Sequence, residues 1–392
     1  MNYVKGKPLF TDINKDKKQF NYLDKDIESD VLIIGGGVTG AINSYYFTKE
    51  NIKTILIEKD RIAHLSTSVT TSLLQYELDN TLAELKDIIG LENGITAYKM
   101  GLDALNEVEK FSNEYDFDYK KRDTLFYTPR KDEKGIIERE FELRRDNGFD
   151  VEFIDKNTYG FDLEYGLLAK NGGCEIDPYK YTNSLLEESI KKGLLVYENT
   201  EAIKMNHNKD FVEVITNYDY KIKAKKIIVA TGYNTSLFTD KRFGTKFNTF
   251  NVVTKPLKNL YKDNVLVRDT KNPYHYFRTT KDNRIIFGGE DVSFDLIDND
   301  EICNKQYDIL EQKLKNMFED VEIEYKYCGC FCSTKDNLGI VGEDTYHKNM
   351  MYCLGYGANG ILFAILGARM LVKLYNGEID QNLELFRLDR PL

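Results

Sequence analysis

The sequence predicts an α/β fold: a Rossmann-like nucleotide-binding domain, discontinuous in sequence, joined to a second, α+β substrate domain built on a mixed sheet. Two observations lead to this prediction. Residues 30–60 read as strand, glycine turn, helix, strand and acid, which is the local order of a dinucleotide-binding unit. Further apolar strands that suit the same sheet occur much later in the chain, and segments of a different pattern interrupt them twice. A chain of 392 residues is long enough for two such domains.

The first unit is "DVLIIGGGVTGAINSYYFTKENIKTILIEKD". Its apolar run Val31–Ile34 predicts a buried parallel strand. The spacing of apolar residues predicts a helix over Val38–Lys49, and Thr54–Ile57 is expected to form a second strand that ends on Glu58.

The three spaced glycines of this unit predict a phosphate cradle. Gly35 permits the tight turn, Gly37 lets the backbone approach a pyrophosphate, and Gly40 lets the helix pack closely on the strand. The N–H groups at the helix start carry partial positive charge, and an acid after the second strand suits ribose hydroxyls. The alternative is a doubly wound fold whose glycine turn binds nothing. The predicted cofactor-binding residues here are Gly35, Gly37, Val38, Thr39, Gly40, Glu58 and Lys59.

Composition and charge argue against several other classes of protein. Lys+Arg 54 against Asp+Glu 64 gives a formal net charge of −10, which argues against a nucleic-acid partner. The polar start, Met1 to Asp30, predicts no secretory signal, and the longest apolar stretch, Ile361–Leu374, is too short for a membrane span. Six cysteines without an export signal indicate reduced thiols. We therefore expect a cytoplasmic protein without a transmembrane segment.

Two later segments add candidate cofactor contacts. A hydroxyl-rich loop follows the first unit, and its side chains can donate hydrogen bonds to phosphates or to a ring edge; a turn with a helix cap is the plainer alternative. The later strand "IIVATG" ends in small residues, which let a ring or pyrophosphate approach the backbone. The loop residues are Ser66, Thr67, Thr70 and Thr71, and the strand residues are Ala230, Thr231 and Gly232.

The same patterns divide the chain. Residues 1–26 form a polar N-terminal arm. The nucleotide-binding domain is predicted to take 27–83, 165–236 and 327–392, and the substrate domain 84–164 and 237–326. Helical periodicity over Leu82–Asn113 predicts one long helix.

Four marks, in order, make the sequence resemble the D-amino-acid oxidase superfamily of FAD-dependent oxidoreductases, particularly its glycine oxidase and sarcosine oxidase-like branch. They are "DVLIIGGGVTGA…ILIEKD", "CEIDPYKY", "IIVATGY" and "STKDNLGIVG…CLGYGANGILFA". The resemblance implies FAD as cofactor, with its ADP half on the glycine turn and Glu58. It also implies that the backbone at Ala202 meets adenine.

The last mark has its own physical logic. "GYGANGI" places a glycine turn before a helix, so that the helix N-terminus would stabilise the negative charge of reduced flavin. The alternative is simple loop flexibility. The residues predicted to meet the flavin here are Gly357, Asn359, Gly360 and Ile361.

One segment departs from the family pattern. Sarcosine oxidases tether FAD through a cysteine at the position that Gly329 occupies here, with Cys328 and Cys330 on either side. We therefore expect noncovalent FAD, with a covalent bond as the alternative. Cys328, Cys330 and Cys332 alternate on one strand face, but no fourth ligand cluster accompanies them, so we predict no metal site.

The stretch "NPYHYFRTTKDNRIIFGG" bears on the substrate. In the family branch, an arginine at the position of Arg278 holds the substrate carboxylate, and a guanidinium suits this because it binds in a two-pronged geometry. Tyr274 and Tyr276 would share its strand face by the period of two, whereas His275 would point to the other face. A surface ion pair for Arg278 and core packing for the tyrosines are the alternatives. We assign no general base; Lys255 is a weak catalytic candidate, with a solvated lysine as the alternative.

The sequence thus predicts an FAD-dependent oxidoreductase that oxidises the C–N bond of an amino acid or secondary amine carrying a carboxylate, by hydride transfer to flavin N5. The first alternative is a flavin dehydrogenase of the same superfamily acting on a 2-hydroxy acid or a glycerol phosphate. The second is a flavin-binding protein without turnover. The electron acceptor (oxygen, a quinone or a carrier protein) and the oligomeric state stay open.

Overall fold

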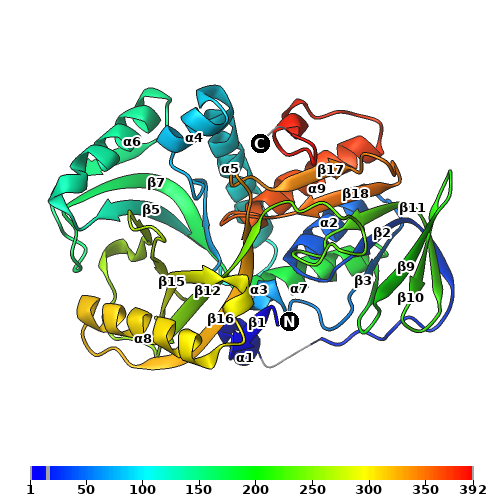
Figure 1. Cartoon of the computed structure of the whole chain (residues 1–392), viewed down its shortest axis with the longest axis horizontal. Helices are drawn as coiled ribbons and strands as arrows, with labels where there is room; N and C mark the ends of the chain where they lie inside the picture. Colours follow the sequence, from blue (N-terminus) through cyan, green and yellow to red (C-terminus); the bar gives the residue numbers. More distant parts are fainter. Residues whose placement is uncertain (1, 15–17, 391–392) are drawn as a thin grey trace. The chain divides into compact units, whose positions relative to one another are not determined.

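The computed structural model describes residues 2–14 and 18–390 as two compact units that alternate along the sequence (Figure 1). Each unit has its own sheet and its own core, and the predicted α/β class with mixed sheets is confirmed. Unit 1 comprises Met1–Asp12, Val69–Asp177 and Lys246–Phe331, and unit 2 comprises Ile13–Ser68, Pro178–Thr245 and Cys332–Leu392.

The described part of unit 2 is built on an eight-stranded sheet (Figure 1). Its central strands run parallel and are buried, which explains why they read as continuous apolar runs. The strands in spatial order are β17 (Ile340–Glu343), β18 (Met350–Leu354), β11 (Lys221–Val229), β2 (Ile27–Ile34), β3 (Thr54–Ile57) and β8 (Leu195–Tyr197), while β10 (Val212–Thr216) joins β9 (Ala202–His207) to β11.

Three helices accompany this sheet. α2 packs against α7 and α9 and on strands β2 and β3, while α9 also packs on β17 and β18. Helix α2 connects β2 to β3 on one side, whereas β11 pairs with β2 on its other side. The strand order therefore reverses beside β2, and this is where ligands bind in open α/β sheets. The helices are α2 (Val38–Lys49), α7 (Pro178–Lys191) and α9 (Gly360–Tyr375).

The described part of unit 1 is built on a ten-stranded mixed sheet. One edge strand of this sheet, β1, comes from the N-terminal segment and pairs antiparallel with β16. The strands in spatial order are β1 (Val4–Gly6), β16 (Ile323–Ser333), β12 (Thr245–Thr254), β15 (Ile285–Ser293), β14 (Tyr276–Thr279), β13 (Leu266–Asp269), β5 (Lys120–Thr128), β7 (Tyr165–Glu175) and β4 (Leu73–Gln75), with β6 (Val151–Ile154) paired to β7.

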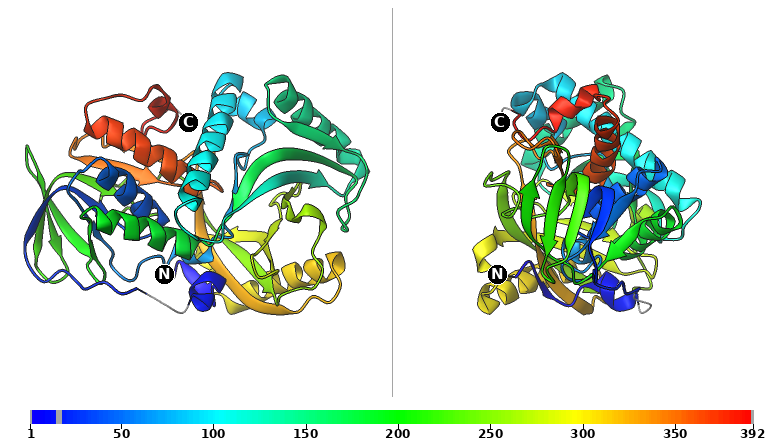
Figure 2. Two further views of the ribbon diagram at one scale, coloured as in Figure 1. Left: turned by 180° about the vertical axis from the view of Figure 1, so that it is seen from behind. Right: turned by 90° about the vertical axis from the view of Figure 1, so that its right-hand side faces the viewer.

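One face of this sheet is the core of unit 1. Figure 2 shows α8 (Asp300–Met317), in yellow, lying along it. The helix turns Cys303, Tyr307, Leu310 and Leu314 inward at helical spacing, onto strand residues such as Phe277. Alternation along the strands therefore directs the neighbouring residues of β14 and β12 to the opposite face. We call this opposite face the polar face; it includes Thr249, Asn251, Tyr276, Arg278 and Tyr327.

The other helices of the described residues precede α7 in the chain. They are α1 (Leu9–Ile13), α3 (Ser66–Val69), α4 (Leu82–Ile88), α5 (Leu91–Ser112) and α6 (Lys134–Asp146), with 3-10 turns at Lys131–Glu133, Lys262–Asn264, Phe294–Leu296 and Gln381–Leu385.

The unit boundaries differ from the predicted domain boundaries. Residues 69–83 and 165–177 were expected in the nucleotide-binding domain but belong to unit 1, because β4 and β7 pair with β5 or with each other in its sheet. The predicted arm 1–26 is also divided, since β1 joins the sheet of unit 1 while Leu23 is buried in the core of unit 2. Residues 1, 15–17 and 391–392 lie outside the described residues.

The predicted long helix over 82–113 is two helices. α4 ends after Ile88, and α5 starts after Gly90, whose φ of +86° cannot continue a helix. The α4 start carries a capping box in which Thr81 accepts from the Glu84 N–H and the Glu84 carboxylate accepts from the Thr81 N–H.

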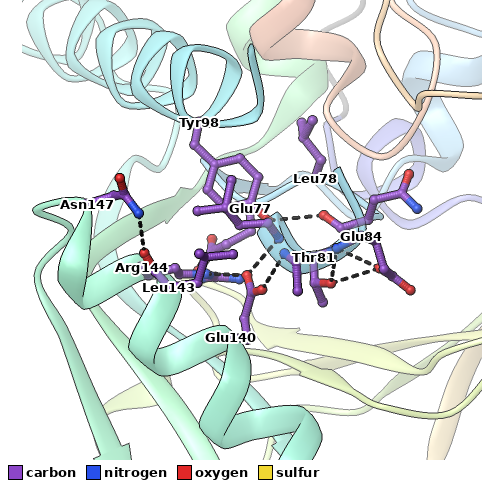
Figure 3. A network of polar contacts seen from close by, with 12 residues as sticks. Glu77, Leu78, Thr81, Glu84, Tyr98, Glu140, Leu143, Arg144 and Asn147 are labelled. Carbon is purple, nitrogen blue, oxygen red and sulfur yellow. Dashed lines mark hydrogen bonds and ion pairs between the residues drawn. The ribbon is translucent and has the colours of Figure 1, made fainter. Parts of the chain in front are cut away.

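A buried charge network holds this region to the rest of unit 1 (Figure 3). Arg144 on α6 is fully buried and donates to Glu140 (2.6 Å) and to Glu77 (2.9 Å). The Glu140 carboxylate also accepts from the N–H groups of Leu82 (2.9 Å) and Ala83 (3.0 Å) at the start of α4. One guanidinium and two carboxylates thus join α6, α4 and the segment after β4.

We expect Glu140→Gln to destabilise the protein strongly, because it removes one negative charge from a buried pair and leaves the Arg144 charge undercompensated. The expected loss in the free energy of unfolding is roughly 3–5 kcal/mol, measured by urea denaturation. Glu138→Gln is the matched control, since Glu138 lies on the same helix in an exposed pair with Lys134, and it should leave the midpoint almost unchanged. Equal midpoints for the two variants would contradict a stabilising role for the network.

Candidate functional site

Four parallel strands of unit 2 end at one edge of its sheet. β18, β11, β2 and β3 are neighbours in that order, and their carboxyl ends lead into Gly355, Ala230, Gly35 and Glu58. The sequence predicted cofactor contacts at all four of these strand ends, two of them within the unit over residues 30–60. The parallel register brings them to the same edge of unit 2.

The first glycine turn depends on two backbone contacts. A Cβ on Gly35, whose φ is +115°, would lie 2.4 Å from the Ala230 carbonyl oxygen. A Cβ on Gly40 would lie 1.8 Å from the Gly35 carbonyl oxygen. Gly37 differs from both, because a Cβ there would meet only Thr67 Oγ1, at 3.3 Å. No backbone atom therefore crowds Gly37, in contrast to Gly35 and Gly40.

Helix α2 begins directly after Gly37. Gly37 is its N-cap, and glycine has no side chain that could accept a hydrogen bond from the first-turn N–H groups of the helix. The N–H of Thr39 is one of these groups. The Val38 N–H donates to Thr67 Oγ1 (2.9 Å). Of the predicted hydroxyl residues, Ser66 and Thr67 lie in unit 2, whereas Thr70 and Thr71 lie in unit 1.

The acid after β3 is buried at the same edge. Glu58 is 7% exposed, and its carboxylate accepts from the N–H groups of Gly36 (2.6 Å) and Asp60 (2.9 Å). Burial raises the pKa of Glu58, and these two hydrogen bonds oppose that change. The side chain of neighbouring Lys59 points to Asp60 and is partly exposed.

The other two strand ends also present backbone and small side chains. The Ala230 N–H donates to the Ile34 carbonyl, and Gly232 has a φ of +57°. The buried Thr231 Oγ1 has no hydrogen-bond partner among the residues that the structure describes. Ala202 begins β9 and is buried in the core of unit 2.

A second glycine turn precedes α9. Gly355 and Gly360 approach so closely that a Cβ on either would lie 2.1 Å or 2.5 Å from the carbonyl oxygen of the other. Gly357 has a φ of +73° and donates to the Cys332 carbonyl (2.8 Å). Buried Asn359 is the N-cap of α9, and Ile361 in the first turn is also buried.

In unit 1, Arg278 is buried on the polar face with 2% exposure. Its guanidinium donates to three carbonyls, from Nε to Thr71 (2.5 Å), from Nη1 to Thr279 (2.9 Å) and from Nη2 to Ile176 (2.8 Å). Burial lowers the pKa of Arg278, and the charge of Glu175 opposes this. The arginine is therefore held by backbone oxygens rather than by a surface ion pair.

The other predicted substrate residues are partly brought together. Tyr276 shares the polar face with Arg278, and its hydroxyl is 2.9 Å from Thr249 Oγ1. Tyr274 precedes the strand, and its hydroxyl donates to Asp79. Lys255 is exposed and forms an ion pair with Glu322. This agrees with the alternative of a solvated lysine rather than a catalytic one.

His275 is buried, and the alternation of β14 directs it away from the polar face, as predicted. Its ring lies between two carboxylates rather than among apolar side chains only. Its ring nitrogens lie 2.9 Å from Asp269 and 2.7 Å from Glu290. The Lys313 ammonium is 2.7 Å from the Nδ1 atom that also meets Asp269.

The structure adds polar-face residues that sequence reasoning missed. Asn251 Oδ1, Tyr327 Oη and Asp291 Oδ1 are buried atoms without a hydrogen-bond partner among the described residues. Alternation in "FNTFNVV" and "YKYCGC" could have drawn attention to Asn251 and Tyr327, but Asp291 follows no regular alternation.

Comparison with known proteins decides the family. The family model described as DAO, FAD dependent oxidoreductase, matches residues 30–374. The chain belongs to this FAD-dependent oxidoreductase family. It is an enzyme, and its cofactor is FAD.

Individual relatives are distant. Glycine oxidase of Bacillus subtilis is 21% identical over 377 residues, covering 92% of this chain and 97% of that protein. A Bacillus subtilis protein named as a Rieske 2Fe-2S iron-sulfur protein is 27% identical over 220 residues, but this match spans only 43% of that relative. The crystal structure of glycine oxidase from Geobacillus kaustophilus has the same fold, with a TM-score of 0.79 at 16% identity, covering 93% of this chain and 99% of that one.

The residues at the sheet edge of unit 2 fit FAD. Gly37, which no backbone atom crowds, and the start of α2 suit the pyrophosphate, and buried Glu58 suits ribose hydroxyls. The unpartnered Thr231 Oγ1 is a buried polar atom that a ligand could satisfy. Among the described helices, none is long and apolar enough to cross a membrane.

The three alternating cysteines do not share one environment. Cys328 packs in the core of unit 1, whereas Cys332 packs in the core of unit 2. Burial raises the pKa of Cys328 to about 11, which keeps it as a thiol, and a thiol is a poor nucleophile. This is consistent with noncovalent FAD, which stays a prediction.

We expect Gly37→Val to weaken FAD binding by about 100-fold or more without unfolding the apoprotein. The valine would fill the space beside the helix start, while its backbone neighbours stay uncrowded. Flavin fluorescence titration measures the affinity, and the apoprotein melting temperature reports the fold. Gly40→Ala is the contrasting variant, because its Cβ would collide with backbone and should lower the melting temperature itself. Normal FAD affinity in Gly37→Val would show that this turn is not the cradle.

Acid precipitation of the purified yellow protein should release all the flavin into the supernatant. The expectation follows from the buried thiol of Cys328 and from the glycine at position 329. Absorbance of pellet and supernatant at flavin wavelengths is the measurement. Flavin that stays in the pellet, and is lost in Cys328→Ser or Cys330→Ser, would establish a covalent bond instead.

Proposed function

We propose that this enzyme oxidises the C–N bond of a small amino acid or secondary amine that carries a carboxylate. The observation that carries the proposal is the buried guanidinium of Arg278 on the polar face of unit 1, among polar atoms that have no partner in the described part of the chain. Buried polar groups are nearly always satisfied, so an unsatisfied group indicates a place for a ligand or water.

Arg278 retains capacity for a carboxylate. A guanidinium has five N–H donors, and three of them serve the backbone carbonyls of unit 1. Nη1 and Nη2 each keep one N–H, and a carboxylate can accept from both. The charge of Arg278 also acts on the buried phenol of Tyr327. Its hydroxyl has no hydrogen-bond partner among the described residues and would donate to the same carboxylate.

The remaining polar-face residues would set position. Tyr276 with Thr249, and Asn251 beside them, offer hydroxyl and amide groups for the amine end of the substrate. Tyr274 would act indirectly, since its hydroxyl is taken by Asp79. When bound, FAD supplies the acceptor for the hydride that leaves the carbon, and the protein supplies binding and orientation.

The names of several relatives support this substrate class, but they do not agree on one substrate. Glycine oxidases are among them, and so are dehydrogenases named for D-amino acids. A glycerol 3-phosphate dehydrogenase is a relative over a shorter stretch, which keeps a hydroxylated substrate as the alternative. The electron acceptor and a cytoplasmic location stay predictions.

We expect wild-type enzyme to be bleached anaerobically by carboxylate-bearing amines and poorly by their decarboxylated analogues. Arg278→Lys should keep FAD but lose about 30- to 1000-fold in kcat/KM, roughly 2–4 kcal/mol of transition-state stabilisation, because lysine keeps the charge and loses the planar fork. The panel comprises glycine, sarcosine, L-proline and D-alanine, the matching amines, 2-hydroxy acids and glycerol 3-phosphate.

Arg284→Lys is the matched control, because Arg284 is a buried arginine directly before the neighbouring strand β15, and it binds Asp282 and the Thr254 carbonyl. FAD content and melting temperature separate a lost substrate contact from a lost backbone contact. Unchanged kinetics in Arg278→Lys would refute the clamp. Bleaching by hydroxy acids alone would replace the amine proposal, and no bleaching by any compound would favour a flavin-binding protein without turnover.

A further inference from the structure

A β-bulge re-aims one carboxylate onto the polar face of unit 1. Phe250 pairs with Gly289 and Asn248 pairs with Val292, so two residues of β15, Glu290 and Asp291, oppose one residue of β12. Regular alternation from Gly289 would direct Asp291 toward the apolar core. The extra residue cancels that alternation and brings Asp291 to the side of the sheet that carries Thr249.

The bulge is held in place by charges. Glu290 has a φ of +55°, which is uncommon for a residue with a side chain. Its carboxylate accepts from the Lys271 ammonium (2.8 Å) and lies 2.7 Å from His275 Nε2. His275 is fixed in turn by Asp269 and Lys313. These charged groups around Glu290 and His275 therefore stabilise the backbone of the bulge, which carries Asp291.

A chain of hydrogen bonds ends on Asp291. The Thr249 hydroxyl hydrogen-bonds to the Asp291 carboxylate and lies 2.9 Å from the Tyr276 hydroxyl. If Thr249 donates to the carboxylate, Tyr276 must donate to Thr249. The tyrosine oxygen is then left to accept, and all three groups present acceptor atoms to a ligand. Asp291 Oδ1 is buried and has no hydrogen-bond partner within residues 2–14 and 18–390.

The neighbouring residues leave these acceptors beside a small polar site. Tyr276, Gly288 and Asn251 lie opposite one another on three adjacent strands. A Cβ on Gly288 would lie 2.4–2.6 Å from the Tyr276 ring and from Asn251 Oδ1, so the glycine lets the ring lie across the strand. Asn251 Oδ1 is itself buried without a hydrogen-bond partner in the part of the chain that the structure describes. A group with several N–H donors would satisfy these oxygens, and an ammonium is such a group.

We propose that Asp291 is the base that takes a proton from the substrate ammonium, and that Thr249 and Tyr276 orient its carboxylate; this inference rests on the proposed amine oxidation. At neutral pH an amine substrate carries an extra proton, and its nitrogen has no lone pair to assist hydride departure from the carbon. In the proposed step an N–H bond breaks and an O–H bond forms on Asp291. The ammonium and carboxylate become a neutral amine and a carboxylic acid, and no electrons are transferred.

The electrostatic surroundings suit this role. Burial raises the pKa of Asp291 to about 6, the Thr249 hydrogen bond opposes the rise, and the charges of Asp79 and Glu290 add to it. His275 lowers it slightly, and the phenol of Tyr276 stays protonated because burial raises its own pKa. A base is most effective when its pKa lies near the working pH.

The test is the pH dependence of kcat/KM for the amine that reduces wild-type enzyme fastest in the anaerobic panel. Wild type should lose activity below about pH 6 as Asp291 becomes protonated. Asp291→Asn should lose about 100- to 10,000-fold at pH 7, and its residual activity should rise about tenfold per pH unit as free amine accumulates. Asp291→Glu should restore part of the loss. Asp295→Asn, the same change at an exposed carboxylate of the same segment, should behave as wild type.

Thr249→Val gives a second readout that does not require loss of the base. Removing a hydrogen bond that lowers the pKa of Asp291 should move the acid limb of the profile to higher pH, and Thr249→Ser should restore it. FAD content and melting temperature exclude misfolding. A profile of Asp291→Asn within threefold of wild type, or an acid limb that does not move in Thr249→Val, overturns the inference alone. Reduction of wild type by hydroxy acids but by no amine overturns the proposed function, and the inference with it.

Discussion

The close approach of bare backbone at the sheet edge of unit 2 is the constraint on which the cofactor site depends. At Gly35, Gly40 and the pair Gly355 and Gly360, a single Cβ would lie within 2.5 Å of a carbonyl oxygen. These contacts bring the starts of two helices, α2 and α9, to the ends of parallel strands. Helix starts present unpaired N–H groups and partial positive charge, so the same contacts that exclude side chains also create the binding groups.

In unit 1 the main constraint is the burial of polar side chains. One face of its sheet buries apolar side chains against α8, whereas the other buries polar ones. Burying polar groups costs free energy unless they are paired. Arg278 meets that demand with carbonyls, and the Arg144 network meets it with two carboxylates. The polar face nevertheless keeps unsatisfied oxygens on Asn251, Tyr327 and Asp291, and this imbalance is the strongest physical sign of a ligand in the unit.

The sequence expectations that differ from the structure share a cause. Residues 165–177 read as a buried strand in either sheet, since a short apolar run does not name its partner strands. The helix over 82–113 kept its apolar period across Gly90, but one residue with positive φ divides it. Tyr274 stands at the right spacing from Arg278, yet it precedes β14 and pairs with Asp79 far away in the chain. In each case a long-range or backbone effect overrode a local period.

The sequence by itself determined the β2–α2–β3 unit, and the helix and second strand begin and end at the predicted residues. It did so because glycine spacing, apolar period and a terminal acid are local requirements of that turn. It also determined the family and FAD, since the ordered marks span nearly the whole match. Only the tertiary structure decided the environment of Arg278, whose carbonyl partners at Thr71 and Ile176 lie 207 and 102 residues away. It alone placed Asp291 on the polar face, because a bulge breaks the period of two on which strand predictions depend.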